Sequence, residues 1–218
     1  MALQWTRRIA QLLIGLVLYG LAIALMVRAA VGVSPWDVLT QGVSLRTGLP
    51  FGLVTNLIGL VVLALWVPLR QPPGIGTVLN VALIGPSAQL GLAVLPHPDA
   101  LLPRVAFFSG GLLLLAVATG LYVGARLGPG PRDGLMTGLV ARTGWPVWAV
   151  RGGIELTVTA IGGVLGGNVG PGTLAFALLI GPLVGFTLPL FHVPGGVEPF
   201  PRALSLPRAA RVLAVTRR

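Results

Sequence analysis

Long apolar runs alternate with short polar breaks along this chain. Six runs hold about 20 mainly apolar residues each, which is the length that an α-helix needs to cross a hydrocarbon core roughly 30 Å thick. We therefore predict six membrane-spanning helices. They cover residues 9–27, 50–69, 76–95, 105–125, 146–165 and 171–190.

The composition agrees with a membrane location. Of the 218 residues, 55% are hydrophobic and 9% are charged, and the mean hydropathy is +0.91. In a typical soluble domain about a quarter of the residues are charged, because the domain must cover its surface with polar groups. The chain has no cysteine, which excludes disulfides and thiolate metal sites. We predict an all-α integral membrane protein.

The charge pattern predicts the orientation in the membrane. The formal charge is +10, and the arginines lie scattered between apolar runs, which favours anionic lipid headgroups as partners over nucleic acid. The positive-inside rule then places both termini in the cytoplasm, with a basic tail (196–218) that lies on the inner leaflet or stays solvated and unstructured. The inside collects Arg7, Arg8, Arg70, Arg126, Arg132, Arg142 and the five arginines of the tail, and the outside holds Arg28, Arg46 and Arg104.

The chain repeats itself. Residues 8–95 align with residues 104–191 at a constant offset of 96, without a gap. Two apolar segments can match by chance, but polar positions match here as well. Asp37 aligns with Asp133, and "RTG" at 46–48 aligns with "RTG" at 142–144. Such a match indicates a duplication. We predict a first repeat over 1–97, a second over 98–195, and the tail over 196–218, with three spans in each repeat.

Each repeat contains one polar segment, "SPWDVLTQGVSLRTGLP" at 34–50 and "GPRDGLMTGLVARTGWP" at 130–146. A helix over 35–47 is only about 20 Å long, too short to cross the hydrocarbon core. We favour a re-entrant or interfacial helix, which makes the second repeat inverted in the membrane. If the polar segments cross instead, the chain has eight spans and parallel repeats.

The ends of these short helices have capping residues. Ser34 and Gly130 stand at the N-cap positions, and a proline follows each at the first helical position. Gly48 and Gly144 are suited to the left-handed conformation that ends a helix. A short helix within a bilayer must satisfy its backbone ends internally, and these residues allow it.

Two carboxylates occupy equivalent positions in the polar segments. Asp37 and Asp133 lie in the first helical turn, where capping of the helix is one role. Binding of a cation or relay of protons is the other, and the two roles are compatible. Gln41 and Thr137 follow four residues later on the same helix faces and are further candidates for substrate or ion binding.

The predicted spans contain a few polar residues. Arg151 and Glu155 lie four apart in the fifth span, either as an ion pair that neutralises itself or as groups that bind an anion and exchange protons. Asn56 and Asn80 are explained equally by interhelical hydrogen bonds and by a binding site.

Gly-Pro pairs lie inside both third spans of the repeats, at Gly85–Pro86 and Gly181–Pro182. Proline removes a backbone hydrogen bond, so we predict a helix break at each pair, either as a rigid kink or as part of a transporter site. No catalytic or metal-binding spacing is visible. We therefore expect no enzyme activity, no metal and no cofactor.

The stretch "GVSPWDVLTQGVSLRTGLPFG" resembles the start of the YczE/YyaS/YitT group of small bacterial membrane proteins. The matching residues are Gly32, Ser34, Pro35, Trp36, Asp37, Gly42, Thr47 and Gly48, and the second copy departs at Gly130 and Arg132. The resemblance covers about residues 5–195. It implies a multi-span protein of the bacterial inner membrane, of a kind often labelled a transporter, without a settled substrate.

These patterns favour a secondary transporter or a solute-binding membrane module for a small solute, which could be anionic. Inverted repeats with a site where the halves meet are common in carriers. The alternative is a membrane scaffold that assists or regulates a membrane-associated enzyme without transport. The sequence leaves open whether the protein forms a homo-oligomer.

Overall fold

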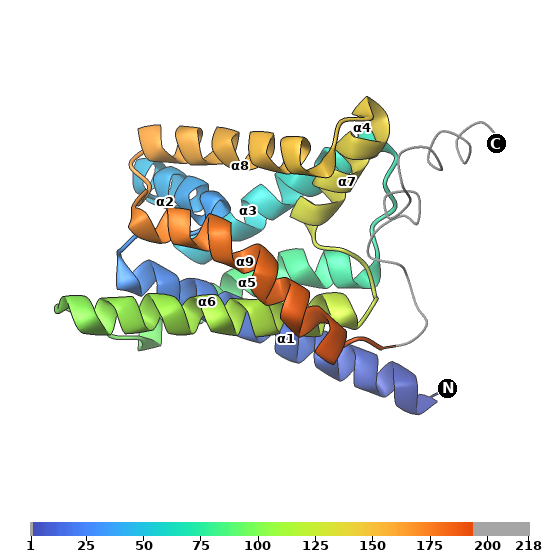
Figure 1. Cartoon of the computed structure of the whole chain (residues 1–218), viewed down its shortest axis with the longest axis horizontal. Coiled ribbons are helices and arrows are strands. Elements are labelled where there is room, and N and C mark those ends of the chain that lie inside the picture. Colours follow the sequence, from blue (N-terminus) through green and yellow to red (C-terminus); the bar gives the residue numbers. More distant parts are fainter. Residues whose placement is uncertain (1, 194–218) are drawn as a thin grey trace.

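The computed structural model describes residues 2–193, and within this range all of the regular secondary structure is α-helical (Figure 1). The predicted basic tail (196–218) lies outside the described residues. The described helices are α1 (Ala2–Ala29), α2 (Pro35–Thr47), α3 (Phe51–Ala64), α4 (Trp66–Leu69), α5 (Ile75–Val94), α6 (Leu101–Gly124), α7 (Pro131–Thr143), α8 (Val147–Val164) and α9 (Pro171–Leu190).

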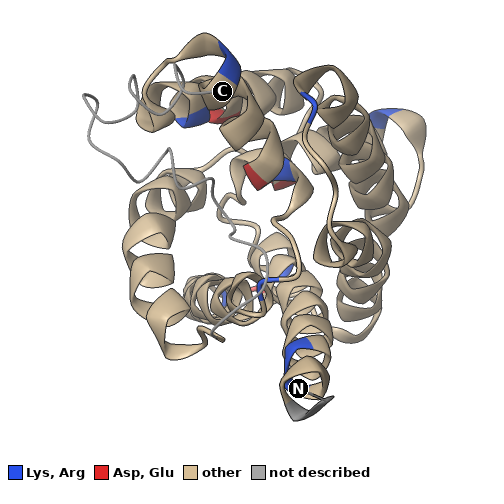
Figure 2. Ribbon diagram, turned by 90° about the vertical axis from the view of Figure 1, so that its right-hand side faces the viewer, with Lys and Arg blue, Asp and Glu red and all other residues tan. Residues whose placement is uncertain are grey.

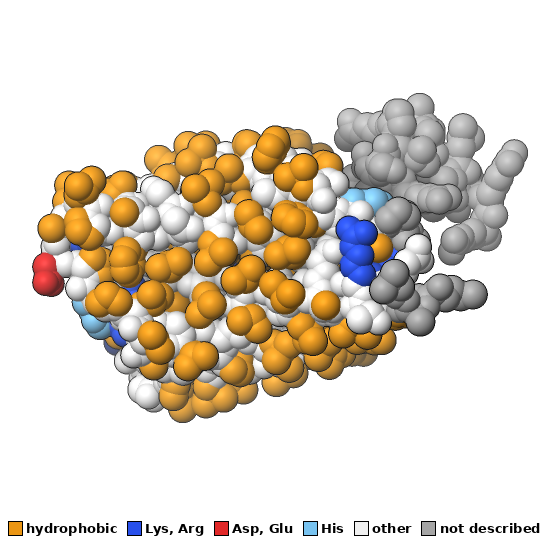
Figure 3. Space-filling view, turned by 90° about the horizontal axis from the view of Figure 1, so that it is seen from below, with side chains coloured by type: hydrophobic (Ala, Val, Ile, Leu, Met, Phe, Trp, Pro, Cys, Tyr) orange, Lys and Arg blue, Asp and Glu red, His pale blue; other side chains and the backbone are white. Residues whose placement is uncertain are grey.

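Five helical segments are long and apolar enough to cross a membrane. They are Gln4–Ala29, Phe51–Leu69, Ile75–Val94, Leu101–Gly124 and Pro171–Leu190. Five of the six predicted spans are therefore supported by length and composition. The sixth is α8, which lies lengthwise beside the others in Figure 1 but carries Arg151 and Glu155. Hydrophobic side chains cover the face seen in Figure 3, and charged side chains lie near its two ends, as expected of a lipid-facing surface.

The antiparallel pair α1 and α6 forms the centre of the core. Two glycines at equivalent repeat positions allow the close approach: a Cβ at Gly15 would lie 2.8 Å from the Tyr122 nitrogen, and one at Gly111 would lie 2.8 Å from Met26 Cγ. Leu12, Leu16 and Ile23 of α1 are fully buried against this pair.

The short helices α2 and α7 begin inside the bundle. Each follows a loop that turns the chain back, and the turns need left-handed backbone at Gly32 (φ +113°) and Gly128 (φ +131°). Each helix then ends at a left-handed glycine, Gly48 (φ 71°) for α2 and Gly144 (φ 70°) for α7. The four predicted capping residues thus stand at the helix ends, since Ser34 and Gly130 are the N-caps.

Contacts between the first and second halves of the chain are reciprocal. The amide of Gly172 donates to the carbonyl of Val31 at 2.8 Å, and the equivalent amide of Gly76 donates to the carbonyl of Leu127 at 2.9 Å. At the ends of the short helices, Arg46 Nε donates to the Leu165 carbonyl at 3.3 Å. Its counterpart Arg142 likewise donates to the Pro68 carbonyl. The C-terminal end of α2 therefore lies beside the end of α8, and the C-terminal end of α7 lies beside α4, which directly follows α3.

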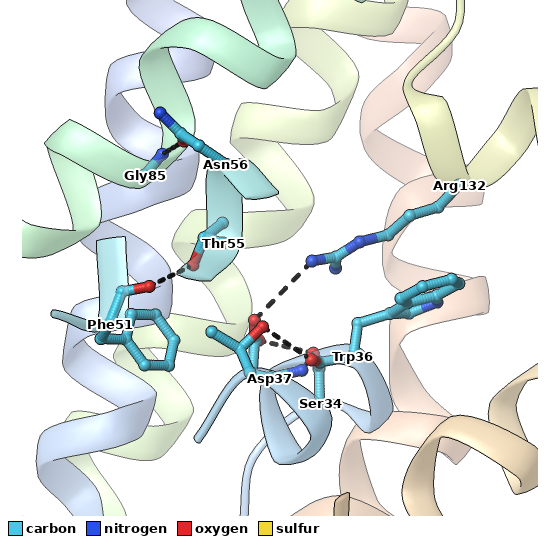
Figure 4. A network of polar contacts seen from close by, with 9 residues as sticks. Ser34, Trp36, Asp37, Phe51, Thr55, Asn56, Gly85 and Arg132 are labelled. Atoms are coloured by element: carbon cyan, nitrogen blue, oxygen red, sulfur yellow. Dashed lines mark hydrogen bonds and ion pairs between the residues drawn. The ribbon is translucent and has the colours of Figure 1, made fainter. Parts of the chain in front are cut away.

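The packing inside the two halves differs. In the first half α3 presses on α5: the Gly85 amide donates to Asn56 Oδ1 at 3.1 Å, and a Cβ at Gly85 would lie 2.2 Å from the Gly52 carbonyl oxygen (Figure 4). In the second half the equivalent Gly181 of α9 and Gly152 of α8 meet no atom within 4 Å of a built Cβ among the described residues. The α8–α9 pair is therefore open where the α3–α5 pair is closed.

The Gly-Pro pairs do not interrupt their helices, and a rigid kink at these pairs stays a prediction. Helix α5 continues through Gly85–Pro86 and helix α9 through Gly181–Pro182. A single proline removes one backbone hydrogen bond, and the remaining bonds of each helix are enough to continue it. The helices that do not run the length of the bundle are α2 and α7, which start within it.

Candidate functional site: a polar cavity between the halves

A cavity of about 260 Å³ lies where the halves meet. All of the longer helices and both short ones contribute to its wall. The N-termini of α2 and α7 reach it from opposite halves, with Ser34 and Gly130 among the lining residues. Seen along the long axis of the molecule, acidic and basic positions lie near the middle of the ring of helices as well as around it (Figure 2). The polar lining residues are Tyr19, Ser34, Trp36, Thr55, Asn80, Thr119, Tyr122, Arg132, Asp133, Arg151 and Glu155.

An ion pair joins the two short helices across the centre. Arg132 Nη2 of α7 lies 4.0 Å from Asp37 Oδ1 of α2 (Figure 4). The Asp37 side chain is 1% exposed, and its other oxygen accepts a hydrogen bond from Ser34 Oγ at 2.5 Å. Its Oδ1 accepts no hydrogen bond from the described residues. The buried carboxylate is therefore held by one short hydrogen bond from Ser34 and by one loose ion pair with Arg132.

Trp36 positions the arginine of that pair. The guanidinium carbon of Arg132 lies 5.1 Å from the centre of the Trp36 ring, within the range of a cation–π contact (Figure 4). The contact helps to hold the Arg132 side chain in place, and the planar guanidinium presents its N–H donors as a fork. Arg132 is 27% exposed, which leaves it accessible from the cavity that it lines.

The second carboxylate has a different partner. Asp133 of α7 accepts a hydrogen bond from the Tyr122 hydroxyl at 3.1 Å. The Tyr122 ring packs edge-on against Tyr19 with the ring centres 5.8 Å apart. These two tyrosines come from α1 and α6, so the core pair of helices also forms part of the cavity wall.

Arg151 and Glu155 form an ion pair within α8. Arg151 Nε lies 2.9 Å from Glu155 Oε1, and the two side chains are 48% and 25% exposed. Both residues line the cavity on the side of the open α8–α9 pair.

The structure brings some of the predicted site residues together and separates others. Asn80, Asp133, Arg151 and Glu155 line the cavity, and Asp37 stands behind Arg132. Three others lie apart from the cavity lining and hold the backbone. Gln41 accepts from the Asn168 amide at 3.0 Å, Asn56 accepts from the Gly85 amide, and Thr137 donates to the Gly134 carbonyl at 3.2 Å.

Sequence reasoning missed Arg132, Trp36, Tyr19 and Tyr122 as site residues. A signal for the first two was present, because position 132 breaks the repeat by placing arginine where the first copy has tryptophan. The tyrosines carry no such signal. Their positions depend on how α1 and α6 cross, which the apolar pattern does not specify.

A bundle of apolar helices with a polar centre defines a multi-pass membrane protein. Residues 6–189 match a family of unknown function, DUF6198, and the chain belongs to that family. It is 38% identical over 197 residues to an uncharacterized protein of Haemophilus influenzae, covering 87% of this chain and 90% of that protein. It is 35% identical over 191 residues to the uncharacterized membrane protein YczE of Bacillus subtilis, covering 87% of each.

A third relative is more distant. The uncharacterized protein YyaS of Bacillus subtilis is 25% identical over 181 residues, covering 81% of this chain and 90% of that protein. No solved structure matches the chain. The resemblance to the YczE-like group is thereby confirmed.

Proposed function

We propose that this protein is a secondary transporter for a small solute, built from two repeats of inverted topology. The observation that carries the proposal is the meeting of the α2 and α7 N-termini at a central polar cavity. Half-helices that end inside a bundle and aim their positive ends at a cavity are a frequent design of carrier binding sites. The reciprocal hydrogen bonds from Gly172 to Val31 and from Gly76 to Leu127 support a two-fold relation between the halves.

The unequal packing of the two halves supports movement between two states. In the structure α3 is closed on α5, whereas α8 stands away from α9 at Gly152 and Gly181. Inverted repeats can exchange such conformations, so that each half adopts in turn the packing that the other has left. In the second state α8 closes on α9, and α3 separates from α5. The cavity then opens on its other side.

Disulfide cross-linking tests this exchange, and the cysteine-free chain makes it clean. The variant Gly152→Cys/Gly181→Cys places a thiol on each of α8 and α9, at positions where a Cβ meets no neighbour among the described residues. The two positions are equivalent to Asn56 and Gly85, which are in contact. We expect the disulfide to form in native membranes, because a thermally sampled second state brings the two thiols within the Cα separation of roughly 4.4–6.8 Å that a disulfide requires.

A matched pair calibrates the result. Gly59→Cys/Val81→Cys joins α3 to α5 at a site where a built Cβ at Gly59 lies 3.8 Å from Val81 Cβ, so this disulfide forms in the state already seen. The calibrating pair should cross-link quickly and the Gly152/Gly181 pair more slowly but to a substantial extent. Complete cross-linking of the calibrating pair with none at Gly152/Gly181 would show a static bundle and would overturn the transporter proposal.

A further inference from the structure

The four charged residues that line the cavity are not equally satisfied. Arg151 and Glu155 bind each other at 2.9 Å, and Asp133 accepts a hydrogen bond from Tyr122. Arg132 has only the 4.0 Å ion pair with Asp37 and the cation–π contact with Trp36 among the described residues. Strong guanidinium–carboxylate hydrogen bonds are about 2.7–2.9 Å long, so the donors of Arg132 are largely unused. The least satisfied charge that lines the cavity is therefore a cation.

Asp37, the partner of Arg132, also has an unused hydrogen-bonding position. It is 1% exposed, and Oδ1 lacks a hydrogen bond within the described structure. A buried carboxylate is stable as an anion only while a cation stands beside it. If another anion takes the Arg132 guanidinium, Asp37 loses that compensation and protonation becomes its least costly state.

We propose that Arg132 binds the carboxylate of a small organic acid, and that Asp37 takes up one proton when the acid anion binds. This inference rests on the proposed function, because it names the substrate class and coupling ion of the same cavity. Before binding, Arg132 and Asp37 neutralise each other. After binding, the carboxylate neutralises Arg132, and Asp37 carries the proton as a neutral acid. The site gains one anion and one proton together, so its net charge is unchanged.

The shape of the site favours a carboxylate with a short apolar body. The planar guanidinium of Arg132, held beside the Trp36 ring, offers a fork of N–H groups that matches a carboxylate. A dianion is disfavoured because Asp133 and Glu155 line the same cavity. The volume of about 260 Å³ lies just below the usual range of ligand pockets, roughly 300–1,000 Å³, so the site suits a small ligand. The body of the ligand would contact Leu115, Ile154, Phe176, Ile180, Val184 and Leu188.

Other ionisable groups face the same space and bear on the proton balance. None of them has the combination of burial, one loose ion pair and a vacant acceptor that Asp37 has within the described structure. Helices α3 and α5 contribute Thr55 and Asn80, which do not titrate. The remaining ionisable groups are Tyr19 on α1, Tyr122 on α6, Arg132 and Asp133 on α7, and Arg151 and Glu155 on α8.

Calorimetry on the detergent-purified protein tests the proposal. The probes are sodium acetate, butyrate, hexanoate and benzoate, titrated in two buffers with different ionisation enthalpies so that proton uptake is measured directly. We expect one or more of these anions to bind with uptake of about one proton, and the apparent affinity to fall about tenfold for each unit of rising pH above neutrality. Failure of all four to bind would overturn the proposal.

Two variants separate the roles. Arg132→Gln should abolish binding of the anion. Asp37→Asn should bind at least as tightly as the wild type, without proton uptake and without the pH dependence, because its neutral amide needs no counter-ion. Arg46→Gln, which changes an arginine at the far end of α2, is the matched control and should bind like the wild type.

The contrary results are equally specific. Unaltered binding by Arg132→Gln, or a proton still taken up by Asp37→Asn, would overturn the assignment. Neither result affects the Gly152/Gly181 cross-link, so a wrong substrate class and a wrong transporter proposal are distinguishable.

Discussion

Trp36 and Arg132 occupy equivalent positions in the two repeats, 96 residues apart, and their side chains contact each other with the guanidinium carbon 5.1 Å from the ring centre. Two equivalent residues can contact each other only where the axis relating the halves passes between them. The pair therefore marks the centre of the proposed two-fold arrangement. The chain places two chemically different residues at this centre, a cation in one half and an aromatic ring in the other.

Replacement of Trp36 tests the value of that contact. Trp36→Leu removes the cation–π contact with Arg132, and we expect it to lower the free energy of unfolding by about 1 kcal/mol. Trp36→Phe keeps an aromatic face and should recover part of that loss. Unfolding by SDS in mixed micelles measures both variants. Equal losses for phenylalanine and leucine would show that the ring contributes only by filling space.

Glycine at position 85 is required by the α3–α5 contact. A Cβ there would lie 2.0 Å from Asn56 Oδ1 and 2.2 Å from the Gly52 carbonyl oxygen, so Gly85→Ala must push the helices apart. We expect a loss of about 1–3 kcal/mol in unfolding free energy. The matched variant Gly181→Ala adds the same methyl group where nothing in the described structure lies within 4 Å, and its stability should stay within about 1 kcal/mol of the wild type.

The two alanine variants also bear on the movement between states. In the proposed second state Gly181 approaches α8 as closely as Gly85 now approaches α3. Gly181→Ala should therefore keep the fold but disfavour that state, which reduces transport. Gly181→Cys carries the same cost, which is one reason why the Gly152/Gly181 pair should cross-link more slowly than the calibrating pair, but the disulfide still traps the second state whenever it is sampled. If Gly181→Ala destabilises the protein as much as Gly85→Ala, α9 is closely packed at Gly181, and the statement that α8 and α9 stand apart there is wrong.

Ser34 links the start of α2 to the buried carboxylate. Its hydroxyl donates to Asp37 at 2.5 Å and accepts from the Asp37 amide at 3.3 Å. Ser34→Ala removes the N-cap and leaves Asp37 with one hydrogen-bond partner fewer, at a cost of about 1–3 kcal/mol. The control is Ser44→Ala, where the lost bond to the Leu49 carbonyl is exposed and water replaces it. Comparable losses in the two variants, measured by SDS-induced unfolding, would contradict a special role for Ser34.

The parts of the fold that could be predicted follow from local rules. Apolar length predicts the spans, and Ser34, Gly48 and Gly144 predict the ends of α2 and α7 because capping depends on adjacent residues only. Gly85–Pro86 misled because a proline in a packed helix need not break it. Arg132 was not predicted as a site residue, since its role depends on Asp37, a residue 95 positions away that only the crossing of the halves brings near.

Labelling of exposed cysteines tests the inverted topology. Gly48 and Gly144 have left-handed backbone that disfavours cysteine, so the neighbouring Leu49 and Trp145 are better sites. Both side chains are exposed, at 38% and 63%. In Figure 1 the helices that precede them, α2 and α7, lie toward opposite ends of the bundle.

The expected outcome is labelling from opposite sides. In intact cells a membrane-impermeant maleimide should label Leu49→Cys directly, and Trp145→Cys only after the membrane is permeabilised, because the positive-inside rule puts the C-terminal end of α7 in the cytoplasm. Labelling of both positions from one side would require α2 and α7 to lie in parallel repeats. That result would contradict the two-fold relation on which the central position of Trp36 and Arg132 depends.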